Sequence, residues 1–382
     1  MLRPAFEAET TPRAAPGLYV SFPFCRQKCT YCNFASGVFS QDLRRRYVTA
    51  LAAEAAASDT LDRADTLYLG GGTPSLLTGE ELDEILGGRR REWAEATVEA
   101  APGDVTEEAA RLWRERGIDR VSLGVQSFDR RVAAAAGRKH SAEQVEQEIS
   151  ILRRAGVERI SVDLIAGLAH QKEADWEESL DWIERLEVEH ASVYMLDADD
   201  DSRLGAEIRS EGGRYGARDV PSDDQTADFY ERAIERLAAM GLEHYEISNF
   251  ARPGCESAHN LKYWTFAPYV GVGSDAHSFD GAERWNNARM ASEYVARWER
   301  GELAAAERET LDAVRRRQDR LLTGLRLRAG APLEPGDLDG REEALEQLLQ
   351  KGWVERPEPQ RLRLTSSGVL FANEVFLELL FE

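Results

Sequence analysis

The chain has 382 residues, which is enough for one large α/β domain and a smaller second domain. With 69 acidic and 48 basic residues its formal net charge is -21, so a general nucleic-acid-binding surface, which needs basic residues, is not expected. No uninterrupted apolar run reaches the length of a membrane-spanning helix, and the polar residues 1–15 lack the apolar core of a secretory signal. These features predict a cytoplasmic protein without a membrane span.

A loop with three cysteines follows the first predicted strand. Apolar residues after Gly17 indicate a short strand, and Cys25, Cys29 and Cys32 come directly after it at spacings of four and three residues. Disulfides are not expected, because the chain has only four cysteines and no secretory signal. Three thiolates can hold an iron–sulfur cluster and leave one iron without a protein ligand, as in a reactive metal site.

A structural zinc site is the alternative for these cysteines. The same three thiolates could recruit Cys255 or a histidine as the fourth ligand of a tetrahedral zinc ion. The spacing alone leaves both metal centres open.

Predicted helices and strands then alternate along residues 16–241. Helices are expected at 42–57, 80–92, 106–116, 141–155, 174–186 and 224–240, and strands at 66–69, 96–99, 121–126, 160–165 and 191–196. About six such βα units indicate an α/β fold with a partial (β/α)6 barrel like that of triosephosphate isomerase. Barrels of this kind place functional groups at the carboxyl ends of their strands.

The rest of the chain is less regular. Residues 197–224 have no periodicity and are expected to form a loop or lid, and 242–308 form an irregular, aromatic-rich extension with one helix at 292–300. Residues 309–382 are predicted to form a smaller α+β domain similar to a winged helix. Its expected elements are helices at 311–322 and 341–351, a strand pair at 353–355 and 361–365, and a last helix at 369–380.

Several strand ends carry residues suited to a polar ligand. The glycine-rich turn 70–74 follows a strand directly, and glycines there let the backbone approach a ligand closely. Asp163 lies in an apolar strand, where a carboxylate needs a partner or a ligand. Glu99 and Gln126 end their strands. Each of these side chains could simply cap the next helix, but together they favour a polar cofactor.

The cysteine loop, with Tyr31 before its last cysteine, resembles the signature CxxxCxxC of radical S-adenosylmethionine (SAM) proteins. In that superfamily the three cysteines hold a [4Fe–4S] cluster, and SAM chelates the fourth iron through its amino and carboxylate groups. Over nearly its whole length the chain resembles the oxygen-independent coproporphyrinogen III oxidase superfamily. The segments that carry it are 19–34, 70–75, 121–128, 137–140, 162–168 and 245–251.

This resemblance implies a SAM site built from several strand ends. The matching positions are Tyr19 for the methionyl part, Gly71, Gly72 and Thr73 for the amino group, and Glu99, Gln126, Arg138 and Asp163 for the carboxylate and ribose region. The barrel is accordingly expected to be of the radical SAM type.

Two branches of the superfamily compete. The oxidases carry a fourth cysteine two positions after the third, where this chain has Phe34, whereas residues 259–264 match the HNxxYW motif of the HemW-type heme chaperones. The resemblance therefore implies a heme chaperone that uses a [4Fe–4S] cluster, SAM and heme and passes heme to an acceptor protein. His259, beside aromatic residues, could ligate the heme iron. The alternative for His259 is a hydrogen-bonded histidine within a buried aromatic cluster.

The alternative function is that of the oxidase branch, radical oxidative decarboxylation of coproporphyrinogen III, and a zinc-stabilised scaffold is the third possibility.

The chain departs from the family pattern at four places without losing a cluster ligand. These are Ser21 in place of histidine, Asn33 in place of aspartate, residues 169–170 in place of Pro-Gly, and Asp275 in place of glycine.

Overall fold

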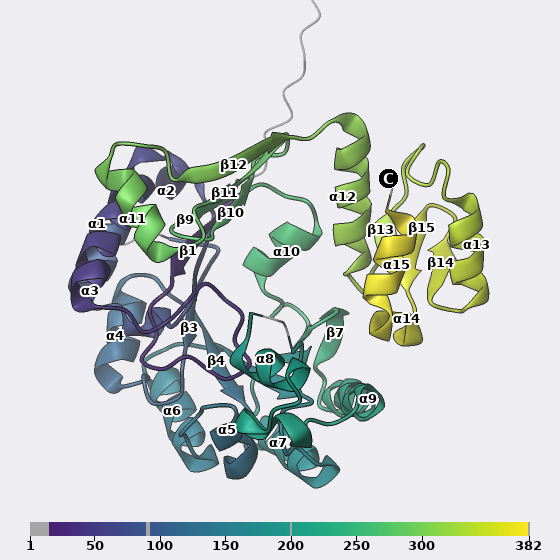
Figure 1. The fold of residues 1–382 in the computed structure, drawn as a ribbon, viewed down its shortest axis with the longest axis horizontal. Coiled ribbons are helices and arrows are strands. Elements are labelled where there is room, and N and C mark those ends of the chain that lie inside the picture. Colours follow the sequence, from purple (N-terminus) through teal and green to yellow (C-terminus); the bar gives the residue numbers. More distant parts are fainter. Residues whose placement is uncertain (1–14, 89–91, 199–200, 381–382) are drawn as a thin grey trace, which may run out of the picture.

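One curved sheet carries most of the fold (Figure 1). The computed structural model describes residues 15–88, 92–198 and 201–380, and within these ranges twelve strands form the sheet in the order β12-β11-β10-β9-β1-β2-β3-β4-β5-β6-β8-β7. Nearly all of the predicted polar leader, residues 1–14, lies outside the described residues. The six central strands run parallel: β1 Gly17–Phe22, β2 Thr66–Gly71, β3 Glu95–Ala100, β4 Arg120–Gln126, β5 Arg159–Ala166 and β6 His190–Met195.

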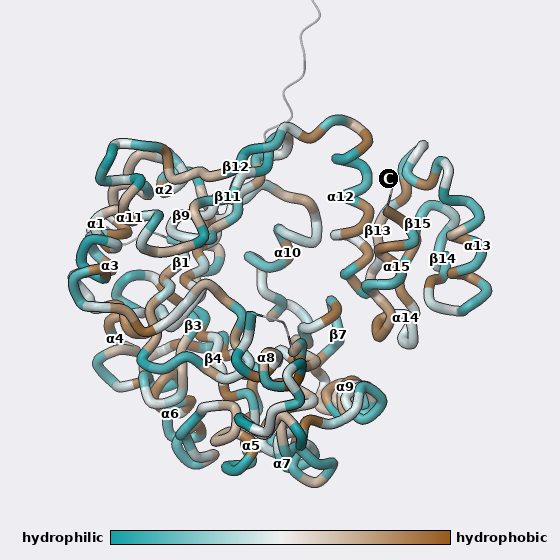
Figure 2. The backbone as a smooth tube through the Cα atoms, viewed as in Figure 1, coloured by the Kyte–Doolittle hydropathy of each residue, from teal (hydrophilic) through white to brown (hydrophobic). Residues whose placement is uncertain are grey.

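Helices connect these strands and cover the outer side of the sheet (Figure 1). The longer ones are α1 Gln41–Ala57, α3 Gly79–Leu86, α4 Glu107–Glu115, α6 Ala142–Arg154, α7 Glu173–Leu186 and α9 Asp223–Ala239, and the short ones are α2 Thr60–Arg63, η1 Pro74–Leu76 and α5 Arg130–Ala135. Several begin at a serine or threonine whose side chain accepts a hydrogen bond from the first turn, as Thr78 does for α3. Figure 2 shows hydrophilic residues along their outer faces.

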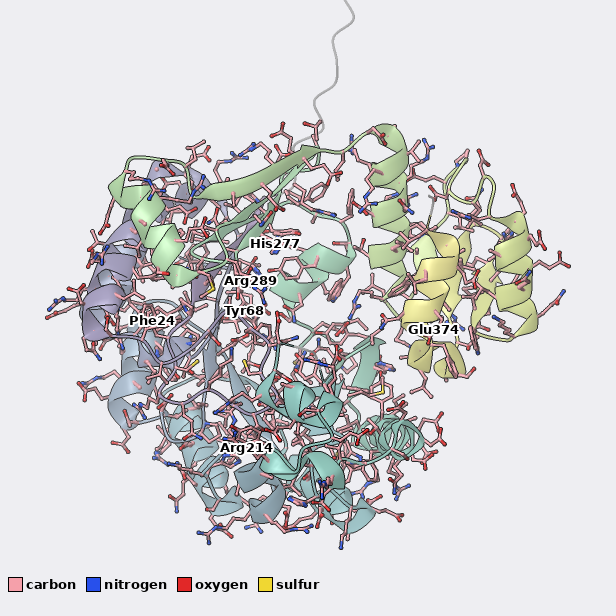
Figure 3. All side chains as sticks on the ribbon, viewed as in Figure 1. Phe24, Tyr68, Arg214, His277, Arg289 and Glu374 are labelled. Atoms are coloured by element: carbon pink, nitrogen blue, oxygen red, sulfur yellow. The ribbon has the colours of Figure 1, made fainter. Side chains whose placement is uncertain are left out.

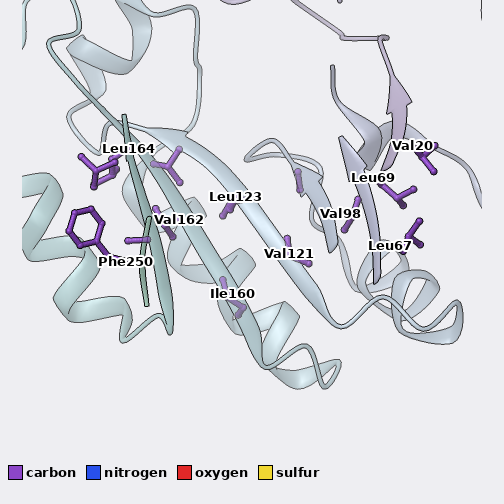
Figure 4. Close-up of a cluster of buried hydrophobic side chains, with 14 of the residues drawn as sticks. Val20, Leu67, Leu69, Val98, Val121, Leu123, Ile160, Val162, Leu164 and Phe250 are labelled. Carbon is purple, nitrogen blue, oxygen red and sulfur yellow. The ribbon is translucent and has the colours of Figure 1, made fainter. Parts of the chain in front are cut away.

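Apolar residues of the parallel strands form the core. Figure 4 shows aliphatic side chains such as Leu69, Val98 and Val121 on neighbouring strands, and all three are at most 1% exposed. Such strands are covered on both faces, which accounts for their nearly continuous apolar runs.

The predicted partial (β/α)6 barrel is confirmed by the six parallel strands. The sheet stays open, because β7 and β12 lie at its two edges in the described part of the chain. One helix is shorter than predicted: α3 ends at Leu86 and not at residue 92, because Gly87 adopts φ 73° and ends it. The short helix α5 was not predicted, since six residues are too few to show a helical period.

The segment expected to be irregular contains regular elements. Within 197–224 the structure has α8 Arg203–Arg209 and the 3-10 helix η2 Arg214–Asp219. Within 242–308 it has β7 Glu243–Glu246, β8 Asn249–Ala251, α10 Ala258–Trp264, β9 Tyr269–Val272, β10 His277–Phe279, β11 Glu283–Asn287, α11 Ala291–Glu299 and β12 Ala305–Thr310. The prediction missed the strands because they are short, and because the exposed edge strand β12 shows no alternation of buried and exposed residues.

The C-terminal part forms a small sheet with four helices. Strands β13 Ala331–Pro332, β15 Arg361–Leu364 and β14 Val354–Glu358 pair antiparallel in this order, beside α12 Ala313–Leu325, α13 Glu342–Gln350, α14 Ser366–Leu370 and α15 Ala372–Leu379. The predicted strand pair is present, β13 was missed, and the last helix is split at Phe371. None of the helices in the described ranges combines the length and the apolar character that a membrane crossing needs.

Candidate functional site

The three cysteines lie in a loop that leaves the carboxyl end of β1. The base of the loop is closed by two backbone hydrogen bonds, from the Cys25 amide to the Gly37 carbonyl at 2.8 Å and from the Gly37 amide to the Pro23 carbonyl at 2.9 Å. A further backbone bond of 3.3 Å ties the loop to the end of α5. The cysteines are therefore held at the end of the barrel where parallel-stranded enzymes place their functional groups.

One cavity of about 300 Å³ contains all three cysteines in its wall. Residues of β2 to β6, most of them near the carboxyl ends of these strands, form much of the remaining wall. The cavity brings together ten of the predicted site residues, namely Cys25, Cys29, Cys32, Gly71, Gly72, Thr73, Glu99, Gln126, Arg138 and Asp163. We call this space the cysteine cavity.

The glycine-rich turn packs directly against the cysteine loop. The Gly72 amide donates to the Phe22 carbonyl at 2.8 Å, which extends the pairing of β1 and β2. A Cβ atom on Gly72 would lie 2.7 Å from the carbonyl carbon of Pro23 and 3.0 Å from the Sγ atom of Cys25. Only glycine fits at this contact, and the Cys25 thiol faces the turn as expected.

Two carboxyl groups line the cysteine cavity, on the strands β3 and β5 that flank β4. Glu99 accepts a hydrogen bond from the Tyr68 hydroxyl at 3.0 Å, and Asp163 accepts one from the Ser122 hydroxyl at 3.0 Å. Burial and the nearby Asp163 carboxylate raise the pKa of Glu99 to about 7, and burial also raises the pKa of Asp163. A positively charged ligand would stabilise the ionised form of both groups, so this wall favours a cation.

Gln126 and Arg138 bring unpaired polar atoms to the same cavity. Gln126 ends β4 with φ 73°, beside a register shift between β4 and β5. In the described part of the chain, Gln126 Oε1 and Arg138 Nε are buried without hydrogen-bond partners. A Cβ atom on Gly124 would lie 3.0 Å from Gln126 Nε2 and 3.2 Å from Arg138 Nη2, so glycine makes room for both side chains. Buried polar atoms without partners are unfavourable, and a polar ligand would supply those partners.

The fourth cysteine lies at the opposite end of the barrel. The Cys255 carbonyl accepts a hydrogen bond from Arg120 Nη2 at 2.8 Å, and Arg120 is the first residue of the seven-residue strand β4. A strand of this length separates its ends by roughly 20 Å. Among the described residues no three His, Cys, Asp or Glu side chains form a ready-made metal site, the loop cysteines included. Cys255 is too distant to complete a zinc site with the three loop cysteines, which share the wall of one cavity.

Residues 19–183 match the Radical SAM superfamily. The heme chaperone HemW of Bacillus subtilis strain 168 is 32% identical over 380 residues, which cover 94% of this chain and 97% of that protein. The heme chaperone HemW of Mycobacterium tuberculosis strain H37Rv is 35% identical over 95% of this chain and 94% of that protein. The chain belongs to the HemW family.

A solved structure supports the fold of this HemW family member. Coproporphyrinogen III oxidase (HemN) from Escherichia coli, a radical SAM enzyme, superposes with a TM-score of 0.83 over 96% of this chain and 90% of that chain, at 22% sequence identity. The likeness establishes a common fold.

The HNxxYW motif of this HemW family member lies within helix α10, and its histidine is buried and hydrogen-bonded. His259 is 0% exposed, its Nδ1 atom lies 2.9 Å from the Thr66 hydroxyl, and its Nε2 atom lies 2.8 Å from the hydroxyl of Tyr263 in the same helix. Burial lowers the pKa of His259 to about 3, so the ring is neutral. Both ring nitrogens are occupied, so the structure shows His259 as the buried, hydrogen-bonded histidine of the alternative, and its role as a heme ligand stays a prediction.

Tyr19 lies beside the cysteine cavity and not in its wall. It lines a second cavity of about 310 Å³ together with Ser21 and Asp275, two of the positions that depart from the family pattern. The two cavities share Phe34, Ser36 and Gly71. We call this second space the tyrosine cavity.

Several hydroxyl groups at the site were missed by the sequence analysis. Ser122, Ser161 and Ser192 all direct hydroxyls to Asp163, and Ser36 lies 3.8 Å from the sulfur of Cys32. Ser122 interrupts an apolar strand, which is a signal comparable to that of Asp163 itself. Ser36 follows the cysteines in a loop and has no such signal.

Proposed function

We propose that this protein is a heme chaperone, which holds a SAM-ligated [4Fe–4S] cluster, binds heme and delivers it to an acceptor protein. The observation that carries the proposal is the convergence of three loop thiols, a glycine turn and unpaired polar groups in one cavity. This cavity belongs to a chain that covers nearly the full length of relatives named heme chaperones.

In this proposal Cys25, Cys29 and Cys32 bind three irons of the cluster and the fourth iron takes SAM. The bound cluster supplies one-electron chemistry, while the protein binds and orients the ligands. The turn 71–73 takes the amino group. Glu99, Gln126, Arg138 and Asp163 take the carboxylate and ribose region, and the two carboxylates also suit the positive sulfonium of SAM.

The experiment is anaerobic reconstitution with iron and sulfide. The wild type and a Cys255→Ser variant should contain iron and sulfide in the ratio of a [4Fe–4S] cluster, whereas Cys29→Ser should not retain it. Addition of SAM should change the electron paramagnetic resonance spectrum of the reduced cluster, and hemin should bind in an absorption titration. Zinc without sulfide in the purified protein, or a wild type that does not bind hemin, would refute the proposal.

The competing enzyme function is decarboxylation of coproporphyrinogen III, and the fold shared with HemN is the observation in its favour. Phe34, at the position of the fourth cysteine of the oxidases, argues against it and is 64% exposed. An anaerobic assay with SAM, reductant and coproporphyrinogen III separates the two functions. Formation of protoporphyrinogen would establish the enzyme and replace the chaperone proposal.

The proposed acceptor is a protein that receives heme by direct contact in the cytoplasm. The net charge of -21 favours transfer to a partner with a basic docking surface, because opposite charges speed protein association. The proposed units are the barrel at 16–241, the extension at 242–308 and the C-terminal unit at 309–382.

A further inference from the structure

The histidines of this chain differ in their availability to a metal. The chain has six histidines, all within the described ranges, and the rings of five of them have a hydrogen-bond or ion-pair partner. These five are His140, His170, His190, His244 and His259. His277 is exposed, and its ring makes no hydrogen bond with the described residues. It is therefore the histidine with both nitrogens free.

His277 is the first residue of β10 and points into the tyrosine cavity. Side chains alternate along a strand, and the next residue, Ser278, is buried and accepts a hydrogen bond from the Gly271 amide at 2.9 Å. His277 consequently lies on the other side, in the cavity wall with Asp275. Figure 3 shows His277 near Arg289 in the centre of the molecule.

Aromatic rings supply much of the remaining wall. Tyr19, Phe34, Tyr263 and Tyr269 line the tyrosine cavity, and the rings of Tyr263 and Tyr269 meet edge to face at 4.6 Å. The Phe34 ring is 64% exposed, so a large apolar group stands uncovered at the boundary between the two cavities. A flat macrocycle buries such rings favourably, and an imidazole nitrogen is a common ligand of its iron.

We propose that the tyrosine cavity binds an iron porphyrin and that His277 is its axial ligand. The proposal rests on the proposed heme-chaperone function and gives the heme a site next to the cysteine cavity. It also gives the HNxxYW motif a supporting role, because His259 positions Tyr263, which lines the cavity, and does not contact the iron.

Charged groups near His277 favour its role as the axial ligand. Asp275 interacts electrostatically with His277 and with Arg289, which places all three close together. A carboxylate beside an imidazole strengthens it as a metal ligand. Arg289 also pairs with Asp201 at 2.8 Å.

The test compares hemin with metal-free protoporphyrin IX on the full-length protein. His277→Ala should bind hemin at least about tenfold more weakly than the wild type and lose the absorption spectrum of an imidazole-ligated iron, and added imidazole should restore that spectrum. Its affinity for protoporphyrin IX should change by less than about twofold, because the aromatic walls remain. His170→Ala, at a histidine paired with Asp219, should behave as the wild type with both probes.

Each other outcome has a defined meaning. If His277→Ala binds hemin with unchanged affinity and spectrum, or loses hemin and protoporphyrin IX equally, His277 is not the axial ligand. A wild type that binds no hemin would instead refute the proposed function itself. His259→Ala should lower the thermal stability, and its folded fraction should keep the imidazole-ligated spectrum.

Discussion

Glu99 combines three features that bear on its ionisation. It accepts a hydrogen bond from Tyr68 at 3.0 Å, stands near Asp163, and is enclosed by protein at the end of β3. Burial and the second carboxylate raise its pKa from 4.5 to about 7. In the absence of a cation, the cysteine cavity therefore holds a carboxyl group that is half protonated near neutral pH.

This shift predicts a pH-dependent stability for the apoprotein. Between pH 4.5 and about 7 the folded state binds a proton that the unfolded state releases, so the contribution of Glu99 to stability is lost as the pH rises. Glu99→Gln stays neutral and should be more stable than the wild type at pH 8 by about 1–3 kcal/mol, with the difference vanishing below pH 4.5.

Urea unfolding at several pH values measures this difference in the free energy of unfolding. The contributions of the other titrating groups cancel, because they are the same in both proteins. Glu107→Gln is the control, because the Glu107 side chain is 82% exposed. Parallel stability curves for the wild type and Glu99→Gln would contradict the assigned ionisation.

The sequence predicted the residues whose type alone signals chemistry. Three cysteines, adjacent glycines and carboxylates at strand ends stand out against apolar strands, and ten of the predicted site residues meet in one cavity. It could not predict that both ring nitrogens of His259 are hydrogen-bonded, because the partner of Nδ1 is Thr66, which is 193 positions away. Nor did it single out His277, whose availability follows from the lack of a hydrogen-bond partner among the residues that the structure describes.

Among the elements, α10 depends on one carboxylate beneath its N-terminus. Glu95 accepts hydrogen bonds from the Ser257 hydroxyl and from the amides of Ala258 and His259, each at 3.0 Å. It also pairs with Arg120 at 2.9 Å, and both side chains are at most 3% exposed. A negative charge at this end of a helix satisfies its free amides and interacts favourably with the helix dipole.

Removing the negative charge of Glu95 should destabilise helix α10. Glu95→Gln leaves the Arg120 guanidinium buried without a counter-charge, and we expect the free energy of unfolding to fall by about 3–5 kcal/mol. Hydrogen exchange should rise first in residues 258–264. The exposed control Glu107→Gln should change stability by less than about 1 kcal/mol. An equal effect of the two substitutions would show that α10 is held mainly by other contacts.

The helices and strands that have a clear local sequence pattern were predicted. Those that depend on contacts with distant parts of the chain were missed. The parallel strands are largely apolar and could be predicted without knowledge of their neighbours. Strand β10 has three residues and α10 seven, too few for a clear period, and both are defined by contacts with distant parts of the chain.

In the whole molecule, one stacked pair helps to join the C-terminal unit to the extension at 242–308. The Arg326 guanidinium at the end of α12 lies 4.3 Å from the ring centre of Trp264 and 3.9 Å from the Glu246 carboxylate. The Glu246 side chain is 1% exposed. The proposed boundary near residue 309 thus lies between parts that remain in contact through the HNxxYW motif.

Trp264→Ala should weaken this junction. We expect a loss of about 1–3 kcal/mol and faster hydrogen exchange in residues 313–379, with the parallel strands still protected. Trp285→Ala is the matched control, because it removes a comparable stack, that of Arg308 on Trp285 at 4.6 Å, which joins β12 to β11 and does not involve the C-terminal unit. Unchanged exchange in the C-terminal unit of Trp264→Ala would show that other contacts hold it.

The common wall of the two cavities has a thermodynamic consequence. The two cavities share three wall residues, Phe34, Ser36 and Gly71. A molecule bound in one cavity would therefore contact residues that also line the other. If the proposed nucleotide and porphyrin both shift these residues, their binding is linked, and the linkage is reciprocal: whatever factor the nucleotide imposes on porphyrin affinity, the porphyrin imposes on nucleotide affinity. Binding and release of heme in the tyrosine cavity would then depend on whether the cysteine cavity is occupied.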